Sequence, residues 1–164
     1  SMLDLLVGHN EPSIVVLGGS WENSIEISSL VEKLHSSGKT VVLIMPLLNI
    51  GFDVPQRWIE KQVQVGRAIS EWKVPADSGL TIRAFRAEID RDLHRYKDDP
   101  RVITVDPQSL ICEHDYCYLV RDDQANFRDT VHISNVNAIQ FRTLFDVAFK
   151  SALANAVEAK KTTN

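Results

Sequence analysis

The chain has 164 residues, 44% of them hydrophobic, and a formal net charge of −4. This length and apolar content suit one soluble globular domain with a sizeable core. Charges of both signs are interspersed without a basic face, which argues against a nucleic acid partner. No apolar run approaches the roughly 18 residues that span a bilayer, and no signal peptide is visible. The opening pair Ser1-Met2 resembles a cloning scar.

The first part of the chain predicts a strand, a helix and a second strand. Residues 13–17 form a short β-branched run that ends at Gly18-Gly19, as expected of a buried strand stopped by a turn. Residues 21–37 carry apolar side chains at helical spacing, and Gly38 marks the end of this helix. Residues 40–45 form a second apolar strand. Within about 30 residues this order is a βαβ unit, and its crossover implies parallel pairing.

The middle of the chain is less regular before the alternation resumes. Residues 49–77 are interrupted by glycine and proline, and we predict one helix among them around 56–69. An amphipathic helix is predicted over 81–96. A third strand is predicted over 101–105, because this run is apolar and ends at an Asp-Pro pair.

A hairpin and a long helix are predicted at the end of the chain. Residues 118–121 and 125–128 can pair across Asp122-Asp123-Gln124. Ser134 is expected to cap the last helix. The residues of this helix expected to face inward are Ala138, Phe141, Leu144, Phe145, Ala148 and Phe149.

Alternating strands and helices predict an α/β fold, a three-layer sandwich with a mainly parallel sheet of the flavodoxin-like type. We expect this domain over 13–157, after a leading segment over 1–12 and before a flexible polar tail over 158–164. Ligands collect at the carboxyl ends of the strands in such sheets. Three segments should lie there, namely Gly18-Gly19-Ser20, the loop over 46–55 and the residues before the last helix.

The two cysteines, Cys112 and Cys117, are separated by four residues. This spacing allows a small loop closed by a disulfide, which would imply an oxidising compartment. It also allows two free thiols in a reducing cytosol. A zinc site with His114 is a third possibility, although a fourth ligand is not evident and the spacing is not that of a zinc finger.

A carboxylate and an imidazole, those of Asp129 and His132, stand three residues apart just before the last helix. In a serine hydrolase, a histidine takes the proton of a nucleophilic hydroxyl, and an acid fixes its tautomer and stabilises the imidazolium. A loop with this spacing can place Asp129 against a ring nitrogen of His132. The same spacing is common by chance, and then it describes a surface aspartate and a histidine near a helix start.

The run Asp129-Thr130-Val131-His132-Ile133-Ser134 resembles the last motif block of SGNH (GDSL-like) hydrolases, which supplies two members of a Ser-His-Asp triad. In that family a glycine usually precedes the following alanine, whereas this chain has Asn137 there. More of the chain resembles one branch, the SGNH domains fused behind acyltransferase-3 membrane domains. Members of that branch O-acylate bacterial surface polysaccharides.

Four further segments are similar to that branch and occur in the same order. They are the strand end Gly18-Gly19-Ser20-Trp21, the stretch Gly51-Phe52-Asp53-Val54-Pro55, the strand end Val105-Asp106-Pro107, and the Cys-x4-Cys loop with the short strand after it, over 112–122. The resemblance extends from Ser13 to Phe149.

Two departures from the family concern the nucleophile and the oxyanion hole. The chain contains no Gly-Asp-Ser block, so we expect an N-terminally truncated domain whose first strand and serine lie upstream. The family often has a polar oxyanion-hole side chain before the tryptophan, and Ser20 stands there, before Trp21. Ser20 also follows a strand and a Gly-Gly turn, which makes it a rival nucleophile, although it lacks a G-x-S-x-G elbow.

The resemblance implies the SGNH domain of a membrane O-acyltransferase that moves an acyl group, acetyl in the first instance, onto a surface polysaccharide such as lipopolysaccharide O-antigen. His132 would act as general base and then acid, and Asp129 would orient it, with Gly19, Ser20 and Trp21 lining the oxyanion and substrate site. This chemistry needs no metal and no cofactor. The implied partners are the polysaccharide acceptor and the acyl-donating membrane domain of the same parent chain, and the implied location is the periplasmic side of the inner membrane.

Two other functions remain open at this point. One is a stand-alone carbohydrate or lipid esterase that uses Ser20 as its nucleophile. The other is a carbohydrate-binding or docking domain without catalysis. Under the favoured hypothesis the isolated chain should be nearly inactive, because its serine lies elsewhere.

Overall fold

The computed structural model describes residues 13–19, 24–76 and 83–162. The chain divides into two compact units, each assembled from separate stretches of sequence. Unit 1 takes its residues from Ser1–Pro46, Ala84–Asp106 and Thr143–Asn164, and unit 2 from Leu47–Arg83 and Pro107–Arg142. Among the described residues, no helix is long and apolar enough to cross a membrane.

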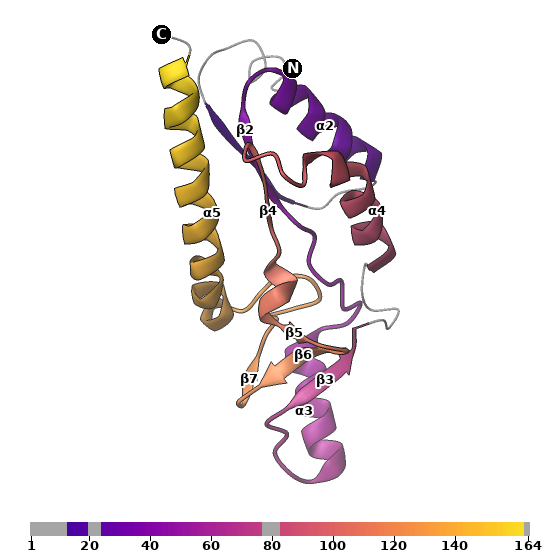
Figure 1. Cartoon of the computed structure of the whole chain (residues 1–164). Coiled ribbons are helices and arrows are strands. Elements are labelled where there is room, and N and C mark those ends of the chain that lie inside the picture. Colours follow the sequence, from indigo (N-terminus) through magenta and orange to yellow (C-terminus); the bar gives the residue numbers. More distant parts are fainter. Residues whose placement is uncertain (1–12, 20–23, 77–82, 163–164) are drawn as a thin grey trace. The chain divides into compact units, whose positions relative to one another are not determined.

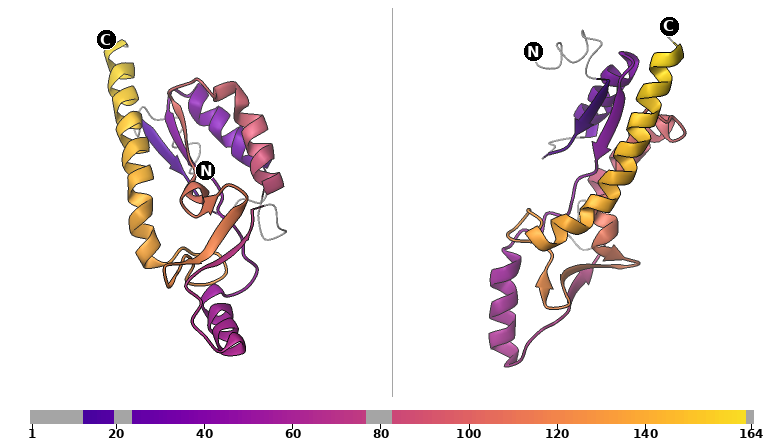
Figure 2. Two further views of the ribbon diagram at one scale, coloured as in Figure 1. Left: turned by 60° about the horizontal axis from the view of Figure 1, so that its bottom comes forward. Right: turned by 90° about the vertical axis from the view of Figure 1, so that its left-hand side faces the viewer.

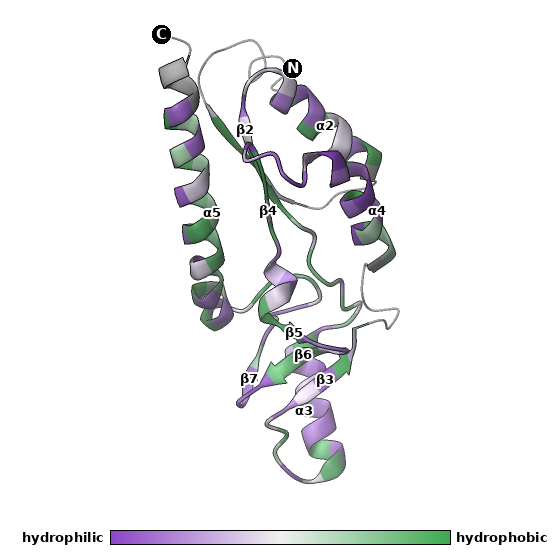
Figure 3. Cartoon of the chain, viewed as in Figure 1, coloured by the Kyte–Doolittle hydropathy of each residue, from purple (hydrophilic) through white to green (hydrophobic). Residues whose placement is uncertain are grey.

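Unit 1 is built on a parallel sheet of three strands, β1 (Ile14–Leu17), β2 (Thr40–Ile44) and β4 (Val102–Val105), in the order β1-β2-β4 (Figure 1). The central strand β2 is buried on both faces from Thr40 to Leu43. Burial on both faces explains its continuous apolar run, which is typical of parallel strands. Colouring by hydropathy shows the same concentration of apolar residues along the strands of this sheet (Figure 3).

Helices cover both faces of this sheet (Figure 2). Helices α2 (Ser24–Ser36) and α4 (Arg83–Leu93) pack on the face that carries Val41 and Leu43. The long helix α5 (Asn135–Thr162) packs on the other face, where Ala148 and Ala152 contact the cluster around Val42. The arrangement confirms the predicted three-layer α/β sandwich with a parallel sheet.

Unit 2 contains a second, antiparallel sheet. Its strands are β3 (Trp72–Pro75), β6 (Tyr116–Arg121) and β5 (Cys112–Glu113) in the order β3-β6-β5, and β7 (Gln124–Ala125) also pairs with β6. Helix α3 (Val54–Val65) precedes this sheet in the chain. The fully buried apolar side chains of unit 2 include Ile50, Val54, Leu119, Val120 and Phe127.

Helix α3 begins and ends where its capping residues place it. Asp53 accepts a hydrogen bond from the backbone N–H of Gln56 at 2.8 Å, and Gly66 ends the helix with a left-handed φ of 68°. Both are standard capping arrangements. The helix is therefore shorter at its C-terminal end than the predicted 56–69 and begins two residues earlier.

Several sequence-based expectations differ from the structure in detail. Strand β3 was not predicted, because a short run that ends in proline gives little strand signal. The hairpin turn is Asp122-Asp123, with φ of 52° and 59°, and Gln124 already pairs with Arg121. In α5, Ala138 and Phe149 are exposed rather than inward, and the helix continues to Thr162.

Short helical turns complete the described elements. A 3-10 helix over His94–Tyr96 follows α4, and another over Pro107–Leu110 follows β4. The first means that the predicted helix over 81–96 ends in a tighter turn than an α-helix.

Of the three possibilities for the cysteines, the structure has the disulfide, between Cys112 on β5 and Cys117 on β6. These two residues are also direct partners in the strand register. Because both sulfurs are bonded to each other, neither is available as a thiolate, so the zinc alternative with His114 is wrong.

Removing this disulfide should weaken the fold. A closed loop this short lowers the entropy of the unfolded chain by an amount worth about 2 kcal/mol at 25 °C. We therefore expect the variant Cys112→Ala/Cys117→Ala to lose about 2 kcal/mol of unfolding free energy in urea denaturation followed by circular dichroism. Reductant should shift the wild-type curve the same way and leave the variant unchanged, and a wild-type curve insensitive to reductant would contradict the expectation.

Candidate functional site

Asp129 and His132 form a close carboxylate–imidazole pair in the loop that precedes α5. Nδ1 of His132 lies 2.8 Å from Oδ2 of Asp129. The other carboxylate oxygen, Oδ1, accepts hydrogen bonds from the backbone N–H of Val131 at 2.9 Å and of His132 at 2.8 Å. One aspartate therefore holds both the backbone turn and the imidazole ring in place.

The hydrogen bonds to Asp129 keep it ionised. They lower the pKa of its carboxyl group from 3.8 to about 2, with the N–H of Val131 as the largest cause and the N–H of His132 next. The ring of His132 lowers this pKa further, by its hydrogen bond and by its charge. Backbone donors have this effect because they stabilise the charged form of a carboxyl group.

An ionised Asp129 determines the tautomer of His132. A carboxylate only accepts hydrogen bonds, so in the neutral ring the proton is held on Nδ1 and Nε2 is left as an acceptor. The side chain of His132 is 60% exposed, and within the described part of unit 2 its Nε2 has no hydrogen-bond partner. The arrangement can accept a proton from an incoming hydroxyl group.

The loop that carries this pair is closed at its base. Phe127 and Ile133 form an antiparallel bridge, and the N–H of Arg128 donates to the carbonyl oxygen of His132 at 2.9 Å. The side chain of Phe127 is fully buried. The loop is thus anchored in the core of unit 2 while its tip remains accessible.

Two buried amides lie beside the base of the loop. Nδ2 of Asn137 donates to Oδ1 of Asn126 at 2.7 Å, and Nδ2 of Asn126 donates to the carbonyl oxygen of Tyr118 at 2.5 Å. Each asparagine is only 6% exposed. We call Asn126 and Asn137 the amide bridge. Neither asparagine was predicted from the sequence to be functional. Asn137 stood out only as a departure from a family pattern.

A second loop of unit 2 contacts the tip of the Asp129–His132 loop. The backbone N–H of Ile50 donates to the carbonyl oxygen of Thr130 at 3.1 Å, and the side chain of Ile50 is fully buried. Ile50 lies in the loop over 46–55, which was predicted to lie at the carboxyl ends of the strands. The hydrogen bond fixes part of that loop against the residue between Asp129 and His132.

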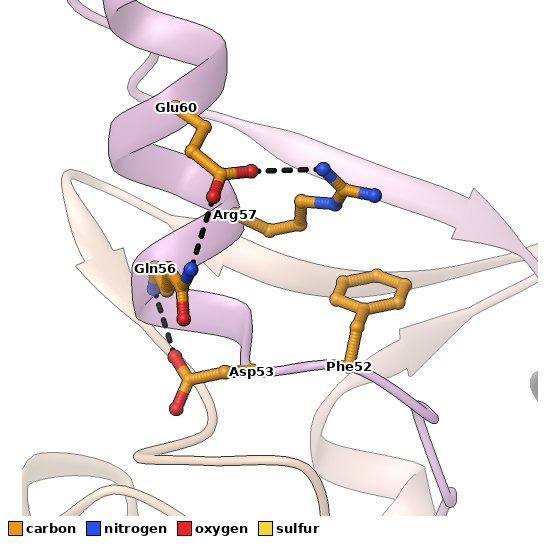
Figure 4. Close-up of a pocket in the computed structure, with 5 residues that line it drawn as sticks. All are labelled: Phe52, Asp53, Gln56, Arg57 and Glu60. Atoms are coloured by element: carbon orange, nitrogen blue, oxygen red, sulfur yellow. Dashed lines mark hydrogen bonds and ion pairs between the residues drawn. The ribbon is translucent and has the colours of Figure 1, made fainter.

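A polar pocket of about 200 Å³ follows on the same segment, at the start of α3. Its lining residues are Phe52, Asp53, Gln56, Arg57 and Glu60 (Figure 4). The polar groups bond to one another, since Glu60 accepts from Gln56 at 3.0 Å and from Arg57 at 2.8 Å. The side chains of Gln56, Arg57 and Glu60 therefore have hydrogen-bond partners within the pocket itself.

The remaining predicted site residues, Gly19, Ser20 and Trp21, follow β1 in the sequence. Gly19 has a φ of 147°, a conformation that side-chain-bearing residues rarely adopt, so this position requires glycine. Ser20 and Trp21 lie outside the described residues. Gly19 belongs to unit 1, whereas Asp129 and His132 belong to unit 2.

In the part of the chain that the structure describes, no group of three or more histidine, cysteine, aspartate or glutamate side chains is arranged to hold a metal ion.

Comparison with known proteins places this geometry in a wider context. The family model of the SGNH domain that is fused to AT3 domains matches residues 1–146. The solved periplasmic domain of a lipopolysaccharide acetyltransferase from Salmonella ser. Paratyphi A aligns with a TM-score of 0.54 and 12% identity, over 88% of this chain. The chain covers 57% of that structure, so it spans little more than half of its length. At this identity the likeness establishes the fold alone. No curated protein matches the chain.

The low pKa of Asp129 makes the stability of the fold depend on pH in the acid range. Because the folded-state pKa is below its ordinary value of 3.8, Asp129 contributes stability that is present above about 3.8 and is lost as the pH falls toward 2. A carbon-13 NMR titration of the carboxyl group should give a midpoint near 2. The Asp129→Asn variant identifies the signal, and a midpoint near 3.8 would show that the backbone hydrogen bonds are not formed in solution.

Proposed function

The chain belongs to the family of SGNH domains that are fused to AT3 domains, and from this premise we propose that it is the SGNH part of a membrane O-acyltransferase. The parent protein transfers an acyl group, acetyl in the first instance, to a bacterial surface polysaccharide such as lipopolysaccharide O-antigen. The fold likeness to the periplasmic domain of a lipopolysaccharide acetyltransferase supports the proposal. The domain then faces the periplasm, with the AT3 membrane domain as its acyl-donating partner.

The observation that carries the proposal is the contact between Oδ2 of Asp129 and Nδ1 of His132 at 2.8 Å. In a serine-dependent acyl transfer, Nε2 of the histidine must be unprotonated and reachable at the start of the cycle. The ionised carboxylate of Asp129 enforces that tautomer, and the exposed ring is open to a hydroxyl group.

The proposed cycle has two halves with the same base. First, a serine Oγ attacks the carbonyl carbon of the acyl donor, its proton passes to Nε2 of His132, and the departing group takes that proton. Then a sugar hydroxyl gives its proton to Nε2 and attacks the acyl-serine, and the serine Oγ leaves with the proton. Asp129 stabilises the imidazolium in both halves and keeps its own negative charge.

We place the nucleophilic serine upstream of this chain in the parent protein, because the 164 residues contain no Gly-Asp-Ser block. The backbone N–H of Gly19 and the side chain of Ser20 are the proposed donors to the oxyanion, and Trp21 the proposed lining of the acceptor site. The position of Gly19 directly after a parallel strand supports this, because ligands collect at that edge of such sheets.

Substitution of the pair in the full-length parent tests the proposal. Asp129→Asn and His132→Ala should each lower acyl transfer to the polysaccharide by about 10³- to 10⁴-fold, since each removes the correctly protonated base. The readout is incorporation of labelled acetyl into the polysaccharide. Asp123→Asn is the matched control, because asparagine tolerates its positive φ of 59° and it lies outside the loop. Wild-type transfer by either site variant would contradict the proposal.

An assay of the isolated chain tests the alternative that it is a stand-alone esterase. We expect it to hydrolyse p-nitrophenyl acetate scarcely above background, because the serine that would form the acyl-enzyme is upstream. In the parent, Ser20→Ala should reduce transfer by about 10²-fold, as expected of one lost oxyanion donor. Rapid hydrolysis by the isolated chain that Ser20→Ala abolishes would instead identify Ser20 as the nucleophile.

A further inference from the structure

We propose that the amide bridge, Asn126 and Asn137, positions the Asp129–His132 pair by fixing both ends of the loop that carries it. The inference rests on the proposed function only where it gives the Asp129–His132 pair a catalytic role. The hydrogen bonds that fix the loop do not depend on that function. In the described part of unit 2, no hydrogen bond joins either asparagine to the carboxylate or the ring, so both act through the loop.

The bridge connects three elements of unit 2 through side chains. Asn137 lies near the start of α5, and its Nδ2 donates to Oδ1 of Asn126. Asn126 in turn donates to the carbonyl oxygen of Tyr118 on β6. A continuous chain of hydrogen bonds thus extends from the last helix through the start of the loop to the central strand of the antiparallel sheet.

The backbone of Asn126 completes the connection. Its N–H donates to the carbonyl oxygen of Leu119 at 2.8 Å, and its own carbonyl oxygen accepts from the N–H of Ser134 at 2.9 Å. Asn126 and Ser134 are the residues at which the loop leaves β7 and enters α5. One residue therefore holds both ends of the loop.

Ser134 is tied to the other asparagine as well. Its Oγ lies 3.1 Å from Nδ2 of Asn137, and the same nitrogen lies 3.3 Å from the carbonyl oxygen of Ala125. An apolar residue at 137 would remove the donor that all of these oxygens share. The loop ends would then be joined by backbone hydrogen bonds alone, and we expect the hydrogen bonds from Val131 and His132 to Asp129 to weaken as a result.

The Asn137→Ala variant of the 164-residue chain tests this role without an activity assay. We expect the pKa of Asp129 to rise from about 2 toward 3.8, because the backbone donors no longer converge on the carboxylate. We also expect the nitrogen-15 shifts of the His132 ring to change from one tautomer, protonated on Nδ1, to a mixture of two. Both quantities are measured by NMR on the labelled chain.

Two further variants separate positioning from general stability. Ile111→Val removes one methyl group from a buried residue of the same unit and should leave both readouts unchanged. Asn137→Ser keeps a donor of shorter reach and should cause the same shifts to a smaller extent, so it serves if Asn137→Ala does not fold.

Three results would overturn the proposal. A folded Asn137→Ala chain with an unchanged Asp129 titration and an unchanged ring tautomer would make the bridge a stabilising feature only. Equal shifts in Ile111→Val would trace the effect to stability, and failure of both Asn137 variants to fold would assign the pair a structural role. If the proposed function itself were wrong, the result would be different, because Asp129→Asn and His132→Ala would then leave acyl transfer intact.

Discussion

Burial of strand β2 on both faces is the constraint from which unit 1 follows. Its side chains alternate between two apolar clusters, with Val41 and Leu43 in one and Val42 in the other. A strand of this kind has no solvated face, so each side must be covered by helices. Parallel pairing with both neighbours then brings the carboxyl ends of the strands to one edge. Arg86 ties that edge together, because it donates to the carbonyl oxygen of Pro46 after β2 and to the carboxylate of Asp106 after β4.

The carboxylate of Asp129 shows how an aspartate beside a histidine can be kept ionised at the surface. Desolvation raises its pKa, but two backbone N–H groups and the neighbouring ring lower it further than desolvation raises it. With a pKa of about 2, this group does not take a proton from an imidazolium near neutral pH. Its role in the proposed chemistry is accordingly orientation and charge stabilisation, rather than proton acceptance.

Structural features that depend on a local sequence pattern were predicted from the sequence. Features that depend on pairing between distant segments were not. The buried strands, the helices and the Asp-x-x-His spacing are visible in short windows. Strand β3 exists because Trp72–Pro75 pairs with β6 more than 40 residues later, which no local window reports. The amide bridge was not predicted from the sequence for a related reason. The buried positions of α5 include 137, 141, 148 and 152, and an asparagine occupies the first of them, so the apolar pattern of the helix does not include it.

The chemistry of the bridge explains why such a position tolerates a polar residue. A buried amide group without a partner costs about 1–3 kcal/mol, and the hydrogen bonds from Asn137 to Asn126 and from Asn126 to Tyr118 avoid that penalty for the groups they join. Loss of Asn137 leaves Oδ1 of Asn126 without its donor, whereas loss of Asn126 leaves Nδ2 of Asn137 with Ser134 and Ala125 as acceptors. An apolar pair of the same volume could stabilise the fold equally well, but it would not specify the separation of the loop ends, because apolar contacts are not directional. The directional hydrogen bonds of Asn126 and Asn137 set that separation, and the alignment of Asp129 with His132 depends on it.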